Sequence, residues 1–261
     1  MNILCVGDIV GRPGRNALAG LLTDLKKEFK LDFVIANGEN SAGGSGITSR
    51  VANELFELGC DCLTTGDHVW DKSEILTFLP TVENLLRPAN FPVGTPGRGW
   101  CVCETQNGYK IGVINLLGRV FMRYNVNCPF RELTSIVDEI KKATPIIVVD
   151  IHAEATSEKV ALGLFIDGKV SAVFGTHTHV QTADEKILPG KTAYITDLGM
   201  TGPHDSVIGQ NKEKIIERFW TSLPTRFDVA TGDLQLQGVV LDIDEKNGSA
   251  RKITRLQRRF Q

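Results

Sequence analysis

The feature that most constrains the fold is the alternation of short apolar runs with segments of helical periodicity. Ile3 to Val6 is a compact apolar run that ends at Gly7-Asp8, and residues 12–30 then carry apolar side chains at helical spacing. Phe33 to Ala36 repeats the apolar run and ends in Asn37-Gly38-Glu39-Asn40. This alternation favours an α/β fold with parallel strand pairing at its start.

Further strands and helices are expected along the rest of the chain. The strands are expected at 60–65, 100–104, 110–115, 146–149, 172–174, 192–196, 236–244 and 250–256, and the helices at 49–58, 71–79, 129–143, 157–165 and 213–221. Hairpin turns are expected at residues 106–108 and 247–248. No repeat or linker divides the sequence, so residues 1–261 are expected to form a single domain with one mixed sheet, or with two sheets packed face to face between helices.

Charge and hydropathy exclude several classes of partner. The formal net charge of the 261 residues is −2, so duplex nucleic acid is not expected as a partner. The beginning of the chain, MNILCVGD, lacks the basic stretch and apolar core of a signal peptide. No apolar run approaches the roughly 20 residues of a membrane helix. We therefore expect a cytoplasmic protein without a membrane partner.

The six cysteines lie at positions 5, 60, 62, 101, 103 and 128. Cys60-x-Cys62 and Cys101-x-Cys103 only weakly suggest a zinc site, because zinc knuckles usually have two or more residues between their cysteines. Residues two apart in a strand share a face, so each pair is expected to supply two small buried side chains. We expect reduced thiols with a structural role.

Polar residues of the kinds that bind metal ions follow one expected strand after another. They are Asp8, Glu39, Asn40, Asp67, His68, His152, His177 and His179. A single Asp at a strand end is usually a helix cap or a turn residue. Ligands, however, bind beyond the carboxyl ends of strands in open α/β sheets, so we expect these side chains to gather in one site.

Carboxylate, amide and imidazole groups together suit Fe, Mn, Co or Zn better than Ca. His177 and His179 would share a face in an extended segment, whereas in a loop each could approach a different metal ion. Two ions about 3.5–4 Å apart clamp the attacking and leaving oxygens of an in-line displacement, and metal coordination can lower the pKa of water to about 7. A bridging hydroxide would then attack phosphorus, with Glu39 as the expected bridging ligand.

Two glycine-rich segments and one aromatic segment leave alternatives open. Gly7-Asp8-Ile-Val-Gly11-Arg-Pro-Gly14 follows a strand as a dinucleotide-binding turn would, but the G-x-G-x-x-G spacing is absent. Gly43-Gly44-Ser45-Gly46 fits a phosphate-approaching loop and a surface turn equally well. Residues 119–131 could stack on a base or grip phosphate, although packing against the domain or a partner subunit is favoured.

The strand-end motifs resemble those of the YmdB family of calcineurin-like metallophosphoesterases. The motifs that carry the resemblance are Gly7-Asp8-Ile-Val-Gly11-Arg-Pro-Gly14-Arg15, Asn37-Gly38-Glu39-Asn40, Gly66-Asp67-His68-Val-Trp70-Asp71, Asp150-Ile-His152-Ala-Glu154, Gly175-Thr-His177-Thr-His179-Val-Gln181-Thr182, Asp197-Leu-Gly-Met-Thr-Gly-Pro203 and Asp205-Ser-Val-Ile-Gly209. The resemblance spans nearly the whole chain. It implies a four-layer α/β/β/α sandwich, a dinuclear centre often occupied by iron, with Mn or Zn as alternatives, and phosphodiesterase activity towards 2′,3′-cyclic nucleotides.

Carried over by motif position, the resemblance also implies roles for individual residues. One metal ion would be held by Asp8, Glu39, Asn40 and His179. The other would be held by Glu39, Asp67, His152 and His177. His68 would lie beside the phosphate and protonate the leaving oxygen or stabilise its charge. A second hypothesis is a regulatory protein whose metals only anchor a nucleotide, and turnover distinguishes the two. The sequence leaves homo-oligomerisation open.

Asp67 departs from the family pattern, in which Asn is expected at this position. Asp8, Glu39, Asp67 and a bridging hydroxide would balance the charge of two divalent ions, whereas Asn would leave one positive charge. We therefore predict that Asp67 tightens metal binding but weakens the activation of water and the attraction for phosphate.

Overall fold

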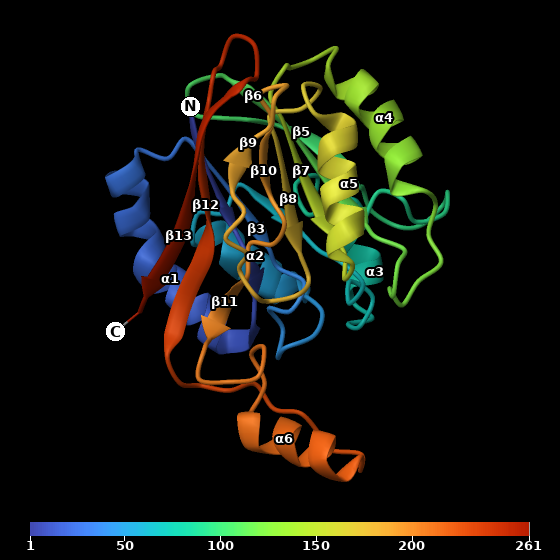
Figure 1. Ribbon diagram of the computed structural model, residues 1–261, viewed down its shortest axis with the longest axis vertical. Coiled ribbons are helices and arrows are strands. Elements are labelled where there is room, and N and C mark those ends of the chain that lie inside the picture. The colour runs from blue at the N-terminus through green and yellow to red at the C-terminus, as the bar shows by residue number, and fades with distance from the viewer. Residues whose placement is uncertain (261) are drawn as a thin grey trace.

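The computed structural model describes residues 1–260 and contains two mixed β-sheets that pack face to face (Figure 1). The first sheet has the order β2-β11-β12-β1-β3-β4, with β13 paired to β12, and the second has the order β5-β6-β7-β8-β10-β9. The first sheet is built from β1 (Asn2–Val6), β2 (Asp8–Ile9), β3 (Phe33–Asn37), β4 (Cys62–Thr64), β11 (Met200–Pro203), β12 (Leu234–Ile243) and β13 (Ala250–Arg259). The second is built from β5 (Trp100–Glu104), β6 (Lys110–Leu117), β7 (Ile147–His152), β8 (Ala172–Thr176), β9 (Lys186–Ile187) and β10 (Ala193–Ile195).

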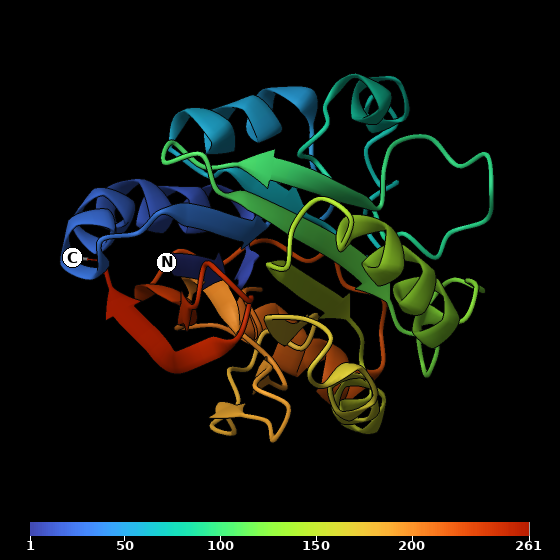
Figure 2. The same cartoon turned by 90° about the horizontal axis from the view of Figure 1, so that it is seen from above.

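Most of the helices cover the outer face of one sheet or the other. The helices are α1 (Gly11–Phe29), α2 (Ser49–Glu57), α3 (Ile75–Phe78), the 3₁₀ turn η1 (Leu79–Thr81), α4 (Pro129–Ile140), α5 (Thr156–Ile166) and α6 (Lys212–Thr221). Figure 2 shows the blue helices α1 and α2 outside one sheet and the yellow-green helices α4 and α5 outside the other. Helix α6 stands away from both sheets at the lower end of Figure 1. Within residues 1–260 no helix has the length and apolar character that crossing a membrane requires.

Strand alternation divides the buried side chains into three cores. In β1, Leu4 and Val6 pack in the core under α1 and α2, whereas Ile3 and Cys5 point between the sheets. In β7, Val148 points between the sheets and Val149 packs in the core under α4 and α5. Three cores separate four layers, which confirms the expected α/β/β/α sandwich.

Most expected elements are confirmed, and the differences have local causes. The pairs β1–β3 and β3–β4 are parallel as predicted, and β5–β6 and β12–β13 form the two expected hairpins. The helix expected at 71–79 was too long, because Asp71 turns its carboxylate to His68 and Pro80 interrupts the α-helical hydrogen bonds. The short strands β2, β9 and β11 were missed because pairing partners define them, not a local pattern.

The cysteine expectation needs two corrections. Cys101 and Cys103 do share a face of β5, with their sulfurs 3.4 Å apart. Cys60 and Cys62 do not share a face, because β4 begins only at Cys62, and they pack in different cores. All six cysteines are free thiols, but Cys103 and Cys128 are only partly buried.

Candidate metal centre

The carboxyl ends of strands from both sheets meet and bring all the predicted ligand residues together. Asp8 begins β2 with one residue between it and the end of β1, His152 is the last residue of β7, and the loop after β8 carries two further histidines. Neighbouring contacts of 4.0 Å or less connect the complete set, which is Asp8, Glu39, Asn40, Asp67, His68, His152, His177 and His179. The topology therefore creates one site from segments that lie far apart in the sequence.

The first half of this site surrounds one nitrogen atom. His152 Nε2 lies 2.9 Å from Glu39 Oε2, 3.2 Å from Asp67 Oδ1 and 3.0 Å from His177 Nδ1. The two imidazole rings meet edge to face, with their centroids 4.8 Å apart. Two carboxylate oxygens and two imidazole nitrogens thus converge on one small volume, which is the donor set of a transition-metal site.

Hydrogen bonds on the far side of the rings orient both histidines. Thr176 Oγ1 donates a hydrogen bond to Asp150 Oδ1 over 2.7 Å and therefore accepts one from the N–H of His152 Nδ1 at 2.9 Å. His177 Nε2 lies 3.1 Å from Glu154 Oε2. These contacts direct the other nitrogen of each ring at the cluster. Hydrogen-bond partners behind metal-binding histidines orient their rings in the same way.

The second half of the site contains Asp8, Asn40 and His179. His179 Nδ1 lies 2.9 Å from the carbonyl oxygen of Ile208, so it donates there and leaves Nε2 free to bind. That Nε2 atom lies 3.1 Å from Asn40 Nδ2 and 3.8 Å from Asp8 Oδ1. Turning the Asn40 amide would present its oxygen to the same point.

Buried oxygens without hydrogen-bond donors show that this site fits a cation. Asp8 Oδ1 and both carboxylate oxygens of Glu39 are buried and have no hydrogen-bond partner anywhere in residues 1–260. The contact from Glu39 Oε2 to His152 is short but lacks hydrogen-bond geometry. Unpaired buried carboxylates are costly unless they coordinate a metal ion. Glu39 contacts His152 at 2.9 Å and His68 at 4.0 Å, and His152 in turn lies 4.0 Å from Asp8 in the second half.

The pKa values of three groups in the site reflect the competition between burial and neighbouring charges. Burial opposes the charged form of His152, but the Glu39, Asp67 and Asp8 carboxylates raise its pKa well above the usual value. Burial also works against ionisation of Asp67, yet hydrogen bonds with His152 and His177 hold its pKa well below the usual range. Burial raises the pKa of Asp150, behind His152, to about 7.

His68 lies at the open side of the site. Its Nδ1 is 2.8 Å from Asp71 Oδ2, and its Nε2 is 4.0 Å from Glu39 Oε1. Arg123 donates to the other Asp71 oxygen over 3.0 Å, and Ser45 also hydrogen-bonds to this carboxylate. Burial opposes ionisation of Asp71, but these donors lower its pKa. The carboxylate therefore fixes the orientation of the His68 ring.

The backbone around the ligands is held in conformations that side chains rarely permit. His177 and His179 have φ angles of 102° and 62°, which an extended strand does not allow. Of the two alternatives that the sequence left open, the loop is therefore the one observed, and each histidine turns to a different half of the site. Such residues cost roughly 1–3 kcal/mol each. A Cβ atom at Gly66 would lie 1.8 Å from Glu39 Oε2, so only glycine fits beneath the ligands.

A buried ion pair supports the loop that carries both histidines. Lys159 Nζ on α5 lies 2.7 Å from Asp197 Oδ2, and both side chains are buried. The same Asp197 oxygen accepts from the backbone N–H of Thr178, between the two histidines, over 3.2 Å. The loop conformation thus depends on a charge pair on the opposite side from the ligands.

A cavity of about 630 Å³ opens beside His68. Gly43, Gly44 and Ser45 line one side of it, and α6 with the segment that follows lines the other through Arg218, Phe219 and Phe227. The glycine-rich segment therefore borders the site. In residues 119–131, Met122 and Tyr124 pack against the core and Arg123 pairs with Asp71, which supports the packing interpretation of that segment.

Sequence reasoning missed the residues that orient the ligands, namely Asp71, Asp150, Glu154, Lys159 and Thr176. Asp71, Asp150 and Glu154 stand inside the motifs that carry the family resemblance, so their positions were visible although their partners were not. Nothing local marks Lys159, because its partner Asp197 is distant in the sequence.

Comparison with known proteins agrees with this geometry. The family model described as "YmdB-like protein" matches residues 4–256. The chain belongs to the YmdB-like family. It is 52% identical over 256 residues to the 2′,3′-cyclic-nucleotide 2′-phosphodiesterase of Bacillus subtilis, which covers 98% of this chain and 96% of that protein.

Solved structures of similar proteins share the YmdB-like fold. A hypothetical protein from Thermus thermophilus superposes with a TM-score of 0.92 at 39% identity, covering 99% of both chains. A novel phosphatase from Mycoplasma pneumoniae gives a TM-score of 0.92 at 35% identity, covering 99% of this chain and 93% of that one. The α/β/β/α sandwich is therefore a property of these relatives as well.

Proposed function

We propose that this protein is a cytoplasmic phosphodiesterase that hydrolyses 2′,3′-cyclic nucleotides at a centre of two metal ions. The observation that carries the proposal is Glu39, whose two buried oxygens lack donors and one of which lies 2.9 Å from His152 Nε2. A carboxylate in that position can offset the repulsion between two cations. The activity named for the Bacillus subtilis relative supports the substrate class.

The ligands divide between the two ions as the family resemblance implies. One ion would be bound by Asp8, Glu39, Asn40 and His179, and the other by Glu39, Asp67, His152 and His177. Iron is the metal we propose, with Mn or Zn as alternatives that suit the same donors. When bound, the ions supply positive charge that neutralises the phosphate and lowers the pKa of the attacking water.

His68 would act as the general acid. Its Nδ1 proton is held by Asp71 at 2.8 Å, so Nε2 faces the centre from the open side. A proton on Nε2 would pass to the leaving ribose oxygen as the phosphorus–oxygen bond breaks. By analogy with the relative's name, the broken bond is the one to O2′, and the product is a 3′-nucleotide.

The cavity beside His68 would hold the nucleoside. Its lining combines aromatic Phe219 and Phe227 with polar Ser45 and Arg218. Arg218 already lies over the Phe227 ring, 4.8 Å from its centroid, so the two form a flat cationic and aromatic surface. A purine or pyrimidine stacks well on such a surface.

The proposal is tested by turnover after metal loading. Purified protein with Fe or Mn should hydrolyse bis(p-nitrophenyl) phosphate and 2′,3′-cyclic AMP, and Asp8→Asn or His179→Ala should abolish both reactions. Arg50→Ala, an exposed change on α2, is the matched control and should keep full activity. Tight binding of nucleotide without turnover across several metals would refute a catalytic role.

The role of His68 has its own signature. His68→Ala should lower the kcat for 2′,3′-cyclic AMP about 10²–10⁴-fold, because the ribose oxygen needs a proton to leave. It should lower the rate with bis(p-nitrophenyl) phosphate far less, because p-nitrophenolate leaves without protonation. An equal loss on both substrates would contradict the assignment as an acid.

A further inference from the structure

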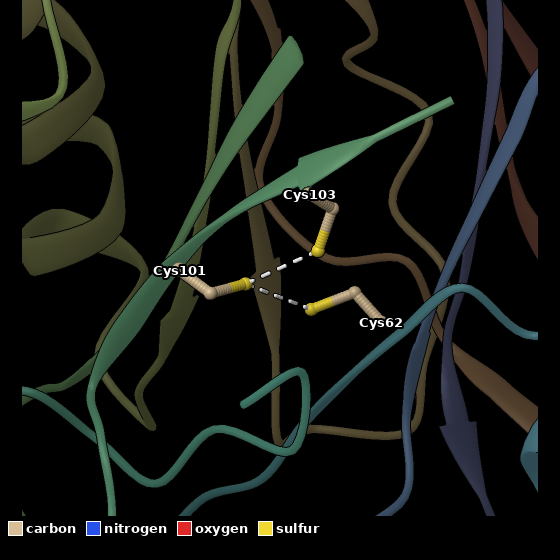
Figure 3. A group of neighbouring side chains, drawn as sticks. All are labelled: Cys62, Cys101 and Cys103. Atoms are coloured by element: carbon tan, nitrogen blue, oxygen red, sulfur yellow. Dashed lines mark hydrogen bonds between the residues drawn. The ribbon is translucent and has the colours of Figure 1, made fainter. Parts of the chain in front are cut away.

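Three cysteines meet where the edges of the two sheets face each other. Cys62 lies on β4, the last strand of the first sheet, and Cys101 and Cys103 lie on β5, the first strand of the second. Figure 3 shows the three sulfur atoms pointing toward one another across the gap between these strands. The cluster is separate from the metal centre described above, because Cys62 begins β4 whereas Asp67 and His68 follow its end.

The spacing of the sulfurs matches that of thiolates around one ion. Cys101 Sγ lies 3.8 Å from Cys62 Sγ and 3.4 Å from Cys103 Sγ, and all three lie within 4.8 Å of one another. Zinc–sulfur bonds of about 2.3 Å place neighbouring sulfurs about 3.8 Å apart in tetrahedral coordination. The three side chains therefore need almost no movement to bind one ion together.

A disulfide explains this arrangement less well. Cys101 and Cys103 are two residues apart on one strand, so their Cα atoms are separated by about 6.6–6.8 Å, at the upper limit for a disulfide. A Cys62–Cys101 bond would leave the third thiol without a role in the cluster. Only a shared ligand uses all three sulfurs.

An acidic cleft gives a cation access to the cluster. Cys101 and Cys103 lie in its wall together with Asp61, Glu83 and Glu104, and no Lys or Arg is among the described residues that line it. Glu83 is paired with Arg98, which stands outside this lining. Cys62 and Cys101 are buried and Cys103 is half-exposed, so the sulfurs are shielded but reachable. Clefts lined by one sign of charge concentrate ions of the other sign.

We propose that Cys62, Cys101 and Cys103 form a second metal site that binds a thiophilic d¹⁰ ion, Zn²⁺ or Cu⁺, as a three-thiolate complex. Soft thiolate ligands select these ions over the harder ions that suit carboxylates. A fourth position stays open toward the acidic cleft. Because the ligands come from both sheets, the bound ion joins the two edge strands and stabilises the folded chain.

The test uses a signal that only sulfur ligands produce. The reduced, metal-stripped full chain is titrated with Cd²⁺, and the ultraviolet thiolate-to-cadmium charge-transfer absorbance is recorded. We expect a band that saturates, that is lost when Zn²⁺ is added in excess, and that is absent from the Cys101→Ser/Cys103→Ser double variant. The oxygen and nitrogen ligands of the other centre give no such band. Cu⁺ thiolates absorb in the ultraviolet themselves, so Zn²⁺ and Cu⁺ are compared by the Cd²⁺ that each releases into a dialysate, and the ion that releases it at the lower concentration is the preferred metal.

Two further variants make the result decisive. Cys60→Ser is the matched control, because Cys60 lines the same cleft but packs in the core under the helices, and it should keep the full band. Cys103→Ser alone, at a half-exposed position, should reduce the band even if the double variant fails to fold. A wild-type chain without the band, or an undiminished band in Cys103→Ser, overturns the proposal.

Discussion

At the scale of single residues, the chemistry depends on buried carboxyl groups that the fold leaves without hydrogen-bond donors. Asp8 and Glu39 are fully buried, and three of their oxygens receive no hydrogen bond from residues 1–260. Water would solvate these oxygens in the unfolded chain, so the folded chain loses that solvation unless cations replace it. The buried carboxyl groups therefore lower the stability of the metal-free protein, and bound metal ions would raise it.

Asp67 is the residue at which this charge balance can be altered most cleanly. Asp67→Asn keeps an oxygen ligand and removes one negative charge, so the attacking water should lose its proton more easily. We expect the rising limb of the pH–rate profile to move to lower pH by about one unit, with a higher metal concentration needed for half-maximal activity. The profile is measured with bis(p-nitrophenyl) phosphate at saturating metal. An apparent pKa that stays the same or rises would contradict this account.

At the scale of elements, the loop after β8 shows how a distant contact shapes a site. Two of its histidines have positive φ angles, and the Asp197 carboxylate behind the loop binds both Lys159 and the Thr178 N–H. Side chains from α5 and from the segment after β10 therefore stabilise a conformation that the loop sequence does not favour on its own.

The Lys159–Asp197 pair gives a stability prediction. Lys159→Met leaves the Asp197 charge buried without its partner, so the free energy of unfolding should fall by about 3–5 kcal/mol. Equilibrium urea unfolding measures the change. Lys169→Ala, at an exposed position shortly after the same helix, should change it by less than about 0.5 kcal/mol. Similar losses in the two variants would show that the buried pair is not the cause.

Two neighbouring aromatic side chains of α6 are similarly exposed, but only one of them lines the cavity. Phe219, which is 83% exposed, lines the cavity beside His68, whereas Trp220, which is 88% exposed, does not line it. Phe219→Ala should raise the KM for 2′,3′-cyclic AMP about 5- to 100-fold, because one stacking contact is worth about 1–3 kcal/mol. The kcat for 2′,3′-cyclic AMP should change little, and so should the KM for bis(p-nitrophenyl) phosphate. Trp220→Ala serves as the control. An equal rise in the KM of this variant for 2′,3′-cyclic AMP would show that the cavity does not bind the nucleoside.

At the scale of the whole molecule, the two sheets share one buried interior that contains side chains from both. β12 pairs with β1, so the first sheet forms only when strands more than 200 residues apart in the sequence come together (Asn2 lies opposite Asp242). This connection supports the expectation that residues 1–261 behave as one domain, which stays a prediction. Calorimetry of the metal-free protein should show one transition whose calorimetric and van't Hoff enthalpies agree. Two resolved transitions would show that the sheets unfold separately.

The sequence alone determined the strands that are long and apolar, the two hairpins, and the residue types of the site. These follow from local rules: alternation and helical spacing report burial, and Asn-Gly reports a tight turn. Because parallel strands present their carboxyl ends at one edge, the sequence could also gather Asp8, Glu39 and His152 into one predicted site.

Only the tertiary structure decided which atoms face each other. It set the distances around His152, turned His177 and His179 in different directions, and paired Lys159 with Asp197. It also separated Cys60 from Cys62 and brought Cys62 to Cys101 and Cys103 across the two sheet edges. Contacts between residues far apart in the chain leave no local pattern, because they depend on how the sheets pack and not on the periodicity of any one segment.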